Sequence, residues 1–456
     1  MRTLGTPLAL GRMGLGAGHA SLLSGGIVAP PAPPLTPPPS ALPAPQNLYS
    51  ASQSSFADAG SWFDGRGDWS IQNGKLVKSG TGANDARLKF DAALTAGRAY
   101  YTLVDLDSGT AGNVKLQLAS PGTGPSRNLL ASWTNFQYSP RGEVGANFAR
   151  LSINPTSDFN GSLDNVRVYD LSTVDPTVVP CDVIIIGGDS NSSSATSEFV
   201  TPANRETPFD PRIWFMPCLR TSPTYNEPGL TRHVPAPAIE PIVGAFGAKR
   251  MSPSHAAAAQ LVDWSAARGR PLLIMALGEA GSGLRNTEDW VKGSTVNNTG
   301  ARMWNEMMAM KAAVMALGPA HQIVGAIWSL GANDRFGGTQ AGHEISIAPF
   351  YSQFFSNVRA DVADVPMVLV NLGAHVKAGG GLEEADGRSE SMRIMLRRFD
   401  QASGDPRSIP RFKVIEPPVG NQLVPGDDTD PHFNAVGIQA NGRAAGAALR
   451  SLLTAG

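Results

Sequence analysis

The chain has 456 residues, 42% of them hydrophobic, and its 37 basic and 38 acidic side chains leave a formal net charge of -1. This balance provides no long-range field to attract nucleic acid, and no uninterrupted apolar run approaches the roughly 20 residues of a membrane span. The length predicts more than one domain, and the roughly 270 residues after position 180 are enough to bury a core of their own.

The first 46 residues are not predicted to fold. Residues 1–28 are rich in Gly, Leu and Ala, and residues 30–45 are dominated by proline. Pro7, Arg12 and repeated glycines interrupt the apolar segment that a cleaved secretory signal needs, although such a signal remains the alternative interpretation. We interpret this region as an attachment segment followed by a stiff proline-rich linker.

Residues 47–172 have the pattern of an all-β sandwich. Short alternating runs, divided by turns rich in Gly, Asn, Asp and Pro, occur at residues 69–72, 100–104, 114–118 and 149–153. The ends of this region, residues 67–74 and 161–168, resemble jelly-roll carbohydrate-binding modules. The region is therefore predicted to bind glycan or to act as a spacer.

A sugar-binding face uses exposed aromatic rings, because these stack on the apolar faces of pyranose rings. Trp62, Trp69 and Trp133 are the candidate substrate-binding residues of the sandwich. A core position is the alternative for each of them, since most aromatic side chains of a small sandwich are buried.

Strand and helix patterns alternate in residues 180–456. Apolar strand patterns occur at residues 182–187, 213–216, 271–277, 323–329 and 366–372, and helical patterns between them at 256–268, 301–317 and 350–362. The alternation predicts a three-layer α/β/α domain with a mostly parallel sheet.

Ser190 is the candidate nucleophile of this domain. Four β-branched residues in a row, Val183 to Ile186, end on Gly187 and Gly188 and are followed by Asp189, Ser190 and Asn191. A run of this kind suits a strand covered on both faces, and the glycine pair permits a tight turn. The serine would then lie at the carboxyl end of a parallel strand, where open α/β sheets place their ligands.

Three further segments follow in order along the chain. Two come directly after apolar strand patterns: Gly278-Glu279-Ala280-Gly281-Ser282-Gly283 and Gly331-Ala332-Asn333-Asp334. The third, Asp427-Asp428-Thr429-Asp430-Pro431-His432-Phe433, precedes a helical pattern near the C-terminus.

The four segments together supply the groups that acyl transfer needs. A serine hydroxyl becomes nucleophilic when a histidine takes its proton, and a carboxylate fixes the tautomer of that histidine. Here Ser190 and His432 would be the catalytic pair. The oxyanion that forms would be held by the backbone N–H groups of Ser190 and Gly281 and by the Asn333 amide.

These segments resemble the four blocks of the SGNH, or GDSL-type, hydrolase superfamily. The Asp189-Ser190-Asn191 sequence, the Gly281-Ser282 segment followed by Trp290, and Ile327-Trp328 are similar to the sialate O-acetylesterase-like carbohydrate esterases within it. The resemblance covers residues 180–456. It implies an acetyl-enzyme mechanism without a metal or cofactor.

The last block departs from the family pattern. That pattern, Asp-x-x-His, would place an aspartate at position 429, where this chain has Thr429. Asp428 and Asp430 are therefore equal candidates to orient His432, with Asp427 behind them. Asn191, and His375 after the last strand pattern, are further candidates to line the substrate pocket.

Cys181 and Cys218 are the only cysteines, and the sequence leaves open whether they form a disulfide or two buried thiols. No metal site is predicted, because the remaining histidines stand in no ligand-like spacing with cysteine or carboxylate.

The sequence predicts an O-acyl ester hydrolase that deacetylates a surface or environmental polysaccharide outside the cell. The alternatives are a general short-chain esterase of the same fold and a catalytically inactive glycan-binding adhesin. The order of attachment segment, possible glycan module and esterase resembles bacteriophage tail proteins, which predicts a virion tail or a homo-oligomer as its assembly.

Overall fold

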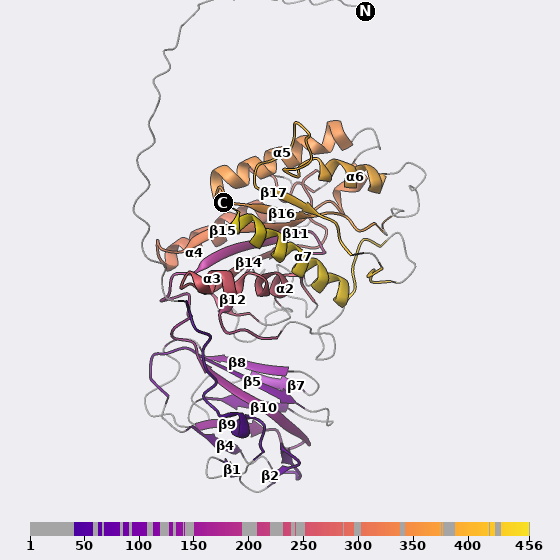
Figure 1. The fold of residues 1–456 in the computed structure, drawn as a ribbon. Helices are drawn as coiled ribbons and strands as arrows, with labels where there is room; N and C mark the ends of the chain where they lie inside the picture. The colour runs from indigo at the N-terminus through magenta and orange to yellow at the C-terminus, as the bar shows by residue number, and fades with distance from the viewer. Residues whose placement is uncertain are drawn as a thin grey trace, which may run out of the picture. The chain divides into compact units, whose positions relative to one another are not determined.

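The computed structural model describes residues 41–455 apart from several gaps (Figure 1). The larger gaps are residues 58–62, 107–112, 119–126, 142–149, 194–207, 219–230, 243–250, 296–301, 338–342, 377–387 and 425–429.

The described part of residues 47–170 forms two five-stranded antiparallel sheets, in the orders β2-β3-β10-β5-β8 and β1-β4-β9-β6-β7, with one short helix, α1 (Ala51–Ser54). The strands are β1 (Phe63–Gly65), β2 (Trp69–Gln72), β3 (Lys75–Lys78), β4 (Ala86–Lys89), β5 (Tyr100–Leu106), β6 (Asn113–Gln117), β7 (Arg127–Leu130), β8 (Thr134–Ser139), β9 (Arg150–Pro155) and β10 (Gly161–Asp170). Side chains of both sheets, such as Leu76 and Leu163 of one and Leu88 and Ile153 of the other, belong to one buried cluster. The jelly-roll connection and glycan binding stay predictions.

Trp69 corrects the expected set of sugar-binding aromatic residues. Its side chain is 5% exposed and stacks on Phe159 with ring centroids 6.2 Å apart inside that buried cluster. Trp69, the first residue of β2, thus points into the core, and its ring is not available to stack on a sugar. Trp62 and Trp133 lie outside the described residues.

The rest of the chain is built on one seven-stranded sheet, in the order β13-β12-β14-β11-β15-β16-β17. All neighbouring strands are parallel except β12 and β13. The strands are β11 (Asp182–Gly188), β12 (Ile213–Pro217), β13 (Ala236–Pro237), β14 (Leu272–Gly278), β15 (Gln322–Ser329), β16 (Met367–Val370) and β17 (Phe412–Ile415). The predicted α/β class with a mostly parallel sheet is confirmed.

Helices cover both faces of this sheet (Figure 1). Val183 and Ile185 of β11 face a cluster with α4 and α5, whereas Ile184 and Ile186 face one with α2 and α7. The helices are α2 (Ser254–Ala259), α3 (Val262–Ala267), α4 (Met303–Leu317), α5 (Ala348–Asn357), α6 (Arg388–Arg397) and α7 (Ala435–Thr454). Burial on both sides explains why the β11 run is continuously apolar.

Two predicted helices differ in detail. The pattern at 256–268 forms two short helices, because the Gln260 and Leu261 N–H groups bond carbonyls three residues earlier, which tightens the chain between α2 and α3. The pattern at 350–362 begins earlier, as α5, and continues into one π-helical turn, Val358–Val362.

Both cysteines are free thiols and both are buried. Cys181 Sγ lies 2.8 Å from His321 Nδ1 at the start of β11, and burial raises the pKa of this thiol to about 12. A disulfide is thus not formed, and Cys181 stays protonated at neutral pH.

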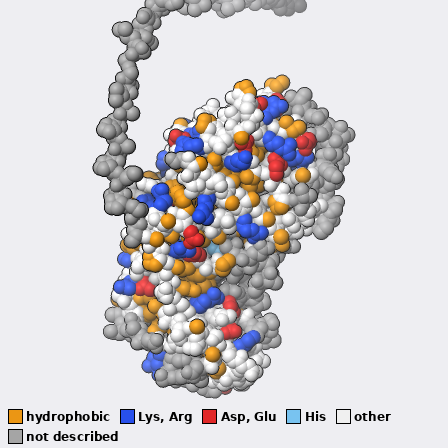
Figure 2. Space-filling view, viewed as in Figure 1, with side chains coloured by type: hydrophobic (Ala, Val, Ile, Leu, Met, Phe, Trp, Pro, Cys, Tyr) orange, Lys and Arg blue, Asp and Glu red, His pale blue; other side chains and the backbone are white. Residues whose placement is uncertain are grey.

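The charged side chains on the surface are mixed in sign, as the balanced composition predicts. On the face shown in Figure 2, Lys and Arg side chains lie among Asp and Glu side chains rather than in a patch of one sign. Within the described ranges, no helix is both long and apolar enough to cross a membrane. In the same part of the chain, no three or more His, Cys, Asp or Glu side chains gather as a metal site would require.

Candidate active site

Ser190 lies at the carboxyl edge of the sheet because β11 ends in a tight turn. Gly188 has φ +139°, and a Cβ there would lie 1.9 Å from the Ser329 carbonyl oxygen of β15. Only glycine fits this conformation and this close approach. The Asp189 N–H then donates to Ser329 O at 2.8 Å, and the Ser192 N–H to Asp189 O at 3.0 Å, which closes the turn around Ser190.

The structure brings His432 to this serine from the far end of the chain. Ser190 Oγ is 2.8 Å from His432 Nε2, and His432 Nδ1 bonds Asp430 Oδ1. A carboxylate on Nδ1 fixes the proton on that nitrogen, so Nε2 is left as the acceptor for the serine hydroxyl. The three side chains therefore have the geometry of a nucleophile, a base and an orienting acid.

Asp430 reaches the imidazole through a two-residue turn. Its Oδ1 also accepts the His432 backbone N–H at 3.1 Å, as in an Asx turn, and Pro431 between them has the φ that such turns favour. The Asp-Pro-His sequence thus folds the carboxylate back onto the ring. Asp428, the other candidate, lies outside the described residues together with Asp427.

The loops after β14 and β15 bring the predicted oxyanion donors to the same edge. Both strands flank β11 in the sheet. Gly281 follows β14 with φ +79°, a conformation that glycine adopts without strain. Asn333 follows β15, and its Nδ2 donates to the Ser282 carbonyl at 2.9 Å. This bond joins the two loops and leaves the amide aligned beside the Gly281 segment.

Asp189 joins the turn that contains Ser190 to the loop that contains Asn333. The carboxylate is buried; one oxygen accepts the Asn191 N–H at 3.1 Å and the other the Ala332 N–H at 3.0 Å. Burial is the main reason that its pKa is raised to about 7, and the charge of Asp334 adds to it. Asp189, directly before Ser190, therefore holds the backbone of Ala332, directly before Asn333.

Asp334 and Ser282 lie at the same edge of the sheet, and the sequence analysis gave neither of them a role of its own. Asp334 is fully buried and accepts the N–H groups of Leu284 and Arg285 and the hydroxyl of Tyr351, the last at 2.9 Å. Ser282 Oγ accepts the Trp290 indole N–H at 3.0 Å. The available signal was the position of Asp334 directly after Asn333, just after a buried strand. A carboxylate that is buried there needs hydrogen-bond donors from neighbouring segments.

Asn191, a predicted pocket residue, contacts the histidine loop. Its side chain is 8% exposed, and its Nδ2 donates to the Pro431 carbonyl at 3.1 Å. His375, the other predicted pocket residue, lies outside the described residues.

Comparison with known proteins adds a distant structural likeness. No protein-family profile matches the chain, and no curated protein matches its sequence. Among solved structures, the chain is similar to a carbohydrate acetylesterase from Xanthomonas citri, with 15% identity over 82% of this chain and 72% of that one and a TM-score of 0.37. It is also similar to a family two carbohydrate esterase from Cellvibrio japonicus, with 12% identity over 87% and 96% of the two chains and a TM-score of 0.34.

A third similar structure is that of NanS, with 11% identity over 60% of this chain and 97% of that one and a TM-score of 0.42. All three TM-scores lie below 0.5. The assignment of a function therefore depends on the geometry of the site.

Proposed function

We propose that the chain is a serine-dependent O-acyl ester hydrolase. The observation that carries this proposal is the contact of Ser190 Oγ with His432 Nε2 at 2.8 Å, with Asp430 on the opposite ring nitrogen. A hydroxyl within hydrogen-bond reach of an oriented imidazole is the arrangement that acyl transfer to serine requires.

In the first half of the reaction, Ser190 Oγ attacks the ester carbonyl carbon while His432 Nε2 takes the hydroxyl proton. The electron pair of the carbonyl bond moves onto oxygen, where the N–H groups of Ser190 and Gly281 and the Asn333 amide stabilise it. When the tetrahedral intermediate collapses, the bond to the alcohol oxygen breaks. His432 returns the proton to that oxygen, which leaves the acyl group on Ser190.

In the second half, water replaces the alcohol. His432 takes a proton from the water as its oxygen attacks the acyl carbonyl, the same donors hold the second oxyanion, and collapse releases the carboxylic acid and restores the Ser190 hydroxyl. Asp430 remains ionised throughout and stabilises the imidazolium that forms in each half.

The acyl group we propose is acetyl and the alcohol a hydroxyl of a polysaccharide. Support comes from the similarity of the Asp189-Ser190-Asn191 segment and of the Gly281-Ser282 segment with Trp290 to sialate O-acetylesterase-like carbohydrate esterases. Action outside the cell follows from such a substrate. Attachment to a virion tail stays a prediction from the order of the domains.

Acetate release from acetylated polysaccharides and from a small aryl acetate tests the proposal. Ser190→Ala should lower kcat by at least about 10⁴-fold with the fold intact. Ser192→Ala is the matched control, because it removes a hydroxyl from the same turn that, among the described residues, bonds a backbone carbonyl, Asp189 O at 3.1 Å. Turnover of the aryl ester alone would favour a general esterase, and glycan binding without any acetate release would indicate an adhesin.

A further inference from the structure

Asn191 joins the two loops that carry Ser190 and His432. Its Nδ2 donates to the carbonyl of Pro431, the residue directly before His432, at 3.1 Å. Its backbone N–H donates to Asp189 Oδ1 at 3.1 Å, which fixes Asn191 in the nucleophile turn. One nearly buried side chain therefore spans the nucleophile turn and the turn that presents the base.

We propose that Asn191 is a positioning residue that holds the His432 turn at hydrogen-bond distance from Ser190. The inference rests on the proposed serine esterase function of the same site. It assigns Asn191 to the alignment of the base, in place of the substrate contact that its position in the sequence suggested.

The chemistry of the contact defines what Asn191 must supply. A proline carbonyl can only accept, so the side chain must present its amino group and not its amide oxygen. Leucine has a similar volume but no donor, and an ionised aspartate would place an oxygen against the Pro431 carbonyl. Neither side chain can replace this bond.

The bond matters because the catalytic pair is otherwise remote in sequence. Ser190 and His432 are separated by 242 positions, and Asn191 and Pro431 by 240. Asp430 orients the imidazole within its own turn, and both of these bonds lie inside the Asp430–His432 segment. A small displacement of the turn would lengthen the Ser190–His432 contact, and displacements of this kind reduce rates strongly.

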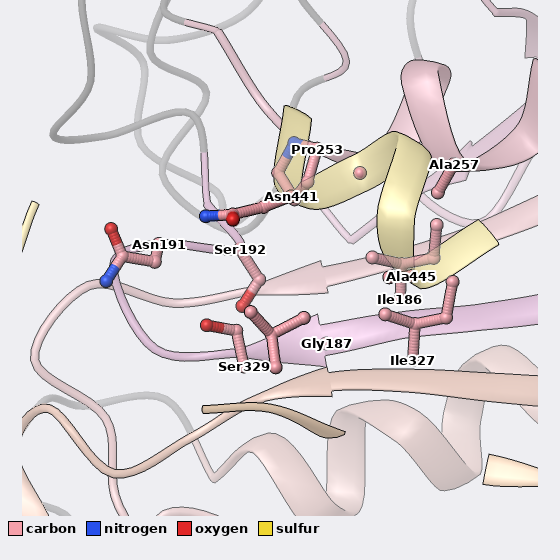
Figure 3. Close-up of a pocket in the computed structure, with 12 residues that line it drawn as sticks. Ile186, Gly187, Asn191, Ser192, Pro253, Ala257, Ile327, Ser329, Asn441 and Ala445 are labelled. Carbon is pink, nitrogen blue, oxygen red and sulfur yellow. The ribbon is translucent and has the colours of Figure 1, made fainter. Parts of the chain in front are cut away.

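Asn441 offers a matched control in the same part of the fold. It extends from α7 into a small cavity that Asn191 and Ser192 also line (Figure 3). Asn441 is 4% exposed and lines the same cavity, so Asn441→Leu controls for the replacement of a buried asparagine by leucine beside Ser192. The bond between Asn191 and Pro431 remains in that variant.

The experiment compares Asn191→Leu, Asn191→Asp and Asn441→Leu with the wild type, using an aryl acetate and a fluorophosphonate that reacts with activated serines. For both Asn191 variants we expect kcat to fall at least about tenfold while KM stays within about twofold. Fluorophosphonate inactivation should slow by the same factor, because it needs the activated serine but no sugar. Asn441→Leu should stay within about threefold of the wild type in both assays.

A second readout separates positioning from general damage. In a His432→Ala background there is no imidazole to align, so adding Asn191→Leu should cause no further loss of activity. Asn191→Asp keeps the side-chain shape should the leucine variant not fold, and thermal unfolding shows which variants are folded.

Three outcomes would overturn the inference: a raised KM with unchanged kcat, which indicates a substrate contact; an equal loss in Asn441→Leu; or a further loss in the His432→Ala background. Failure of the proposed function itself looks different. The wild type would then neither release acetate nor react with the fluorophosphonate.

Discussion

A single oxygen of Asp430 accepts both the backbone N–H of His432, at 3.1 Å, and the ring Nδ1–H of the same residue. The carboxylate thus fixes the position of the backbone and the orientation of the ring together. Of the two aspartates that the sequence left as equal candidates, Asp430 makes this contact, and Asp428 lies outside the described residues.

Asp430→Asn should lower kcat for an aryl acetate by about 10³- to 10⁴-fold, because a neutral amide neither fixes the tautomer nor stabilises the imidazolium. The turn should survive, since the asparagine oxygen can still accept the His432 N–H. Asp428→Asn is the control and should remain close to the wild type. The reverse ranking of the two variants would assign the orienting carboxylate to position 428.

The free energy of unfolding should depend on the ionisation of Asp189. Burial raises the pKa of this carboxyl from 3.8 to about 7, so the folded state binds more protons than the unfolded state between these values. Stability is therefore lost as the pH rises through this window, by up to about 1.4 kcal/mol per pH unit from this group. Urea unfolding at about pH 5 and pH 7 measures the effect.

Asp189→Asn provides the comparison for that pH dependence. The variant should be less stable overall, because an amide cannot accept both the Asn191 and the Ala332 N–H groups. Its stability should nevertheless change less between the two pH values than that of the wild type. Parallel pH profiles for the two proteins would show that Asp189 does not titrate there.

Asp334→Ala should destabilise the protein by about 3 kcal/mol or more, because it leaves the N–H groups of Leu284 and Arg285 and the buried Tyr351 hydroxyl without this acceptor. Activity should also fall, since these bonds hold the loop that carries Gly281. Tyr351→Phe removes one of the bonds and should cost about 1 kcal/mol. Equal losses in the two variants, measured in urea, would contradict a role in holding the loop.

Gly188→Ala should be among the most damaging single substitutions, with a cost of more than about 3 kcal/mol. Its Cβ would lie 1.9 Å from Ser329 O at a φ of +139°. Gly293 is a suitable control, because it has φ +76° but no atom within 4 Å of the place that an added methyl group would occupy. Gly293→Ala should cost only about 1 kcal/mol, the strain of the backbone alone. Thermal unfolding of the two variants distinguishes the clash from the strain.

The sheet was predictable where the apolar pattern is strong. The runs at 182–187, 271–277 and 323–329 correspond to β11, β14 and β15, because strands buried on both faces need continuous apolar sequence. β17, by contrast, has only four residues with alternating burial and gave no comparable signal.

The site was predictable as a set of residue types but not as a set of contacts. Ser190, Asn333 and His432 follow from chemistry and order along the chain. The roles of Asp189 and Asn191 depend on Ala332 and Pro431, which lie 143 and 240 positions away. No local pattern encodes such partners. The Asp430 turn is local, but its Asp-Pro-His spacing is one residue shorter than the Asp-x-x-His pattern used for comparison. The sequence therefore left Asp428 and Asp430 as equal candidates.

The three side chains of the site are joined by one contact that is local in sequence and one that is long-range. Acid and base are two positions apart and can meet as soon as three residues adopt the turn. Base and nucleophile are 242 positions apart and meet only when the C-terminal segment has closed onto β11. The recovery of activity during refolding should therefore report when the C-terminal segment packs against β11. We expect secondary structure to recover earlier, because it does not need this contact.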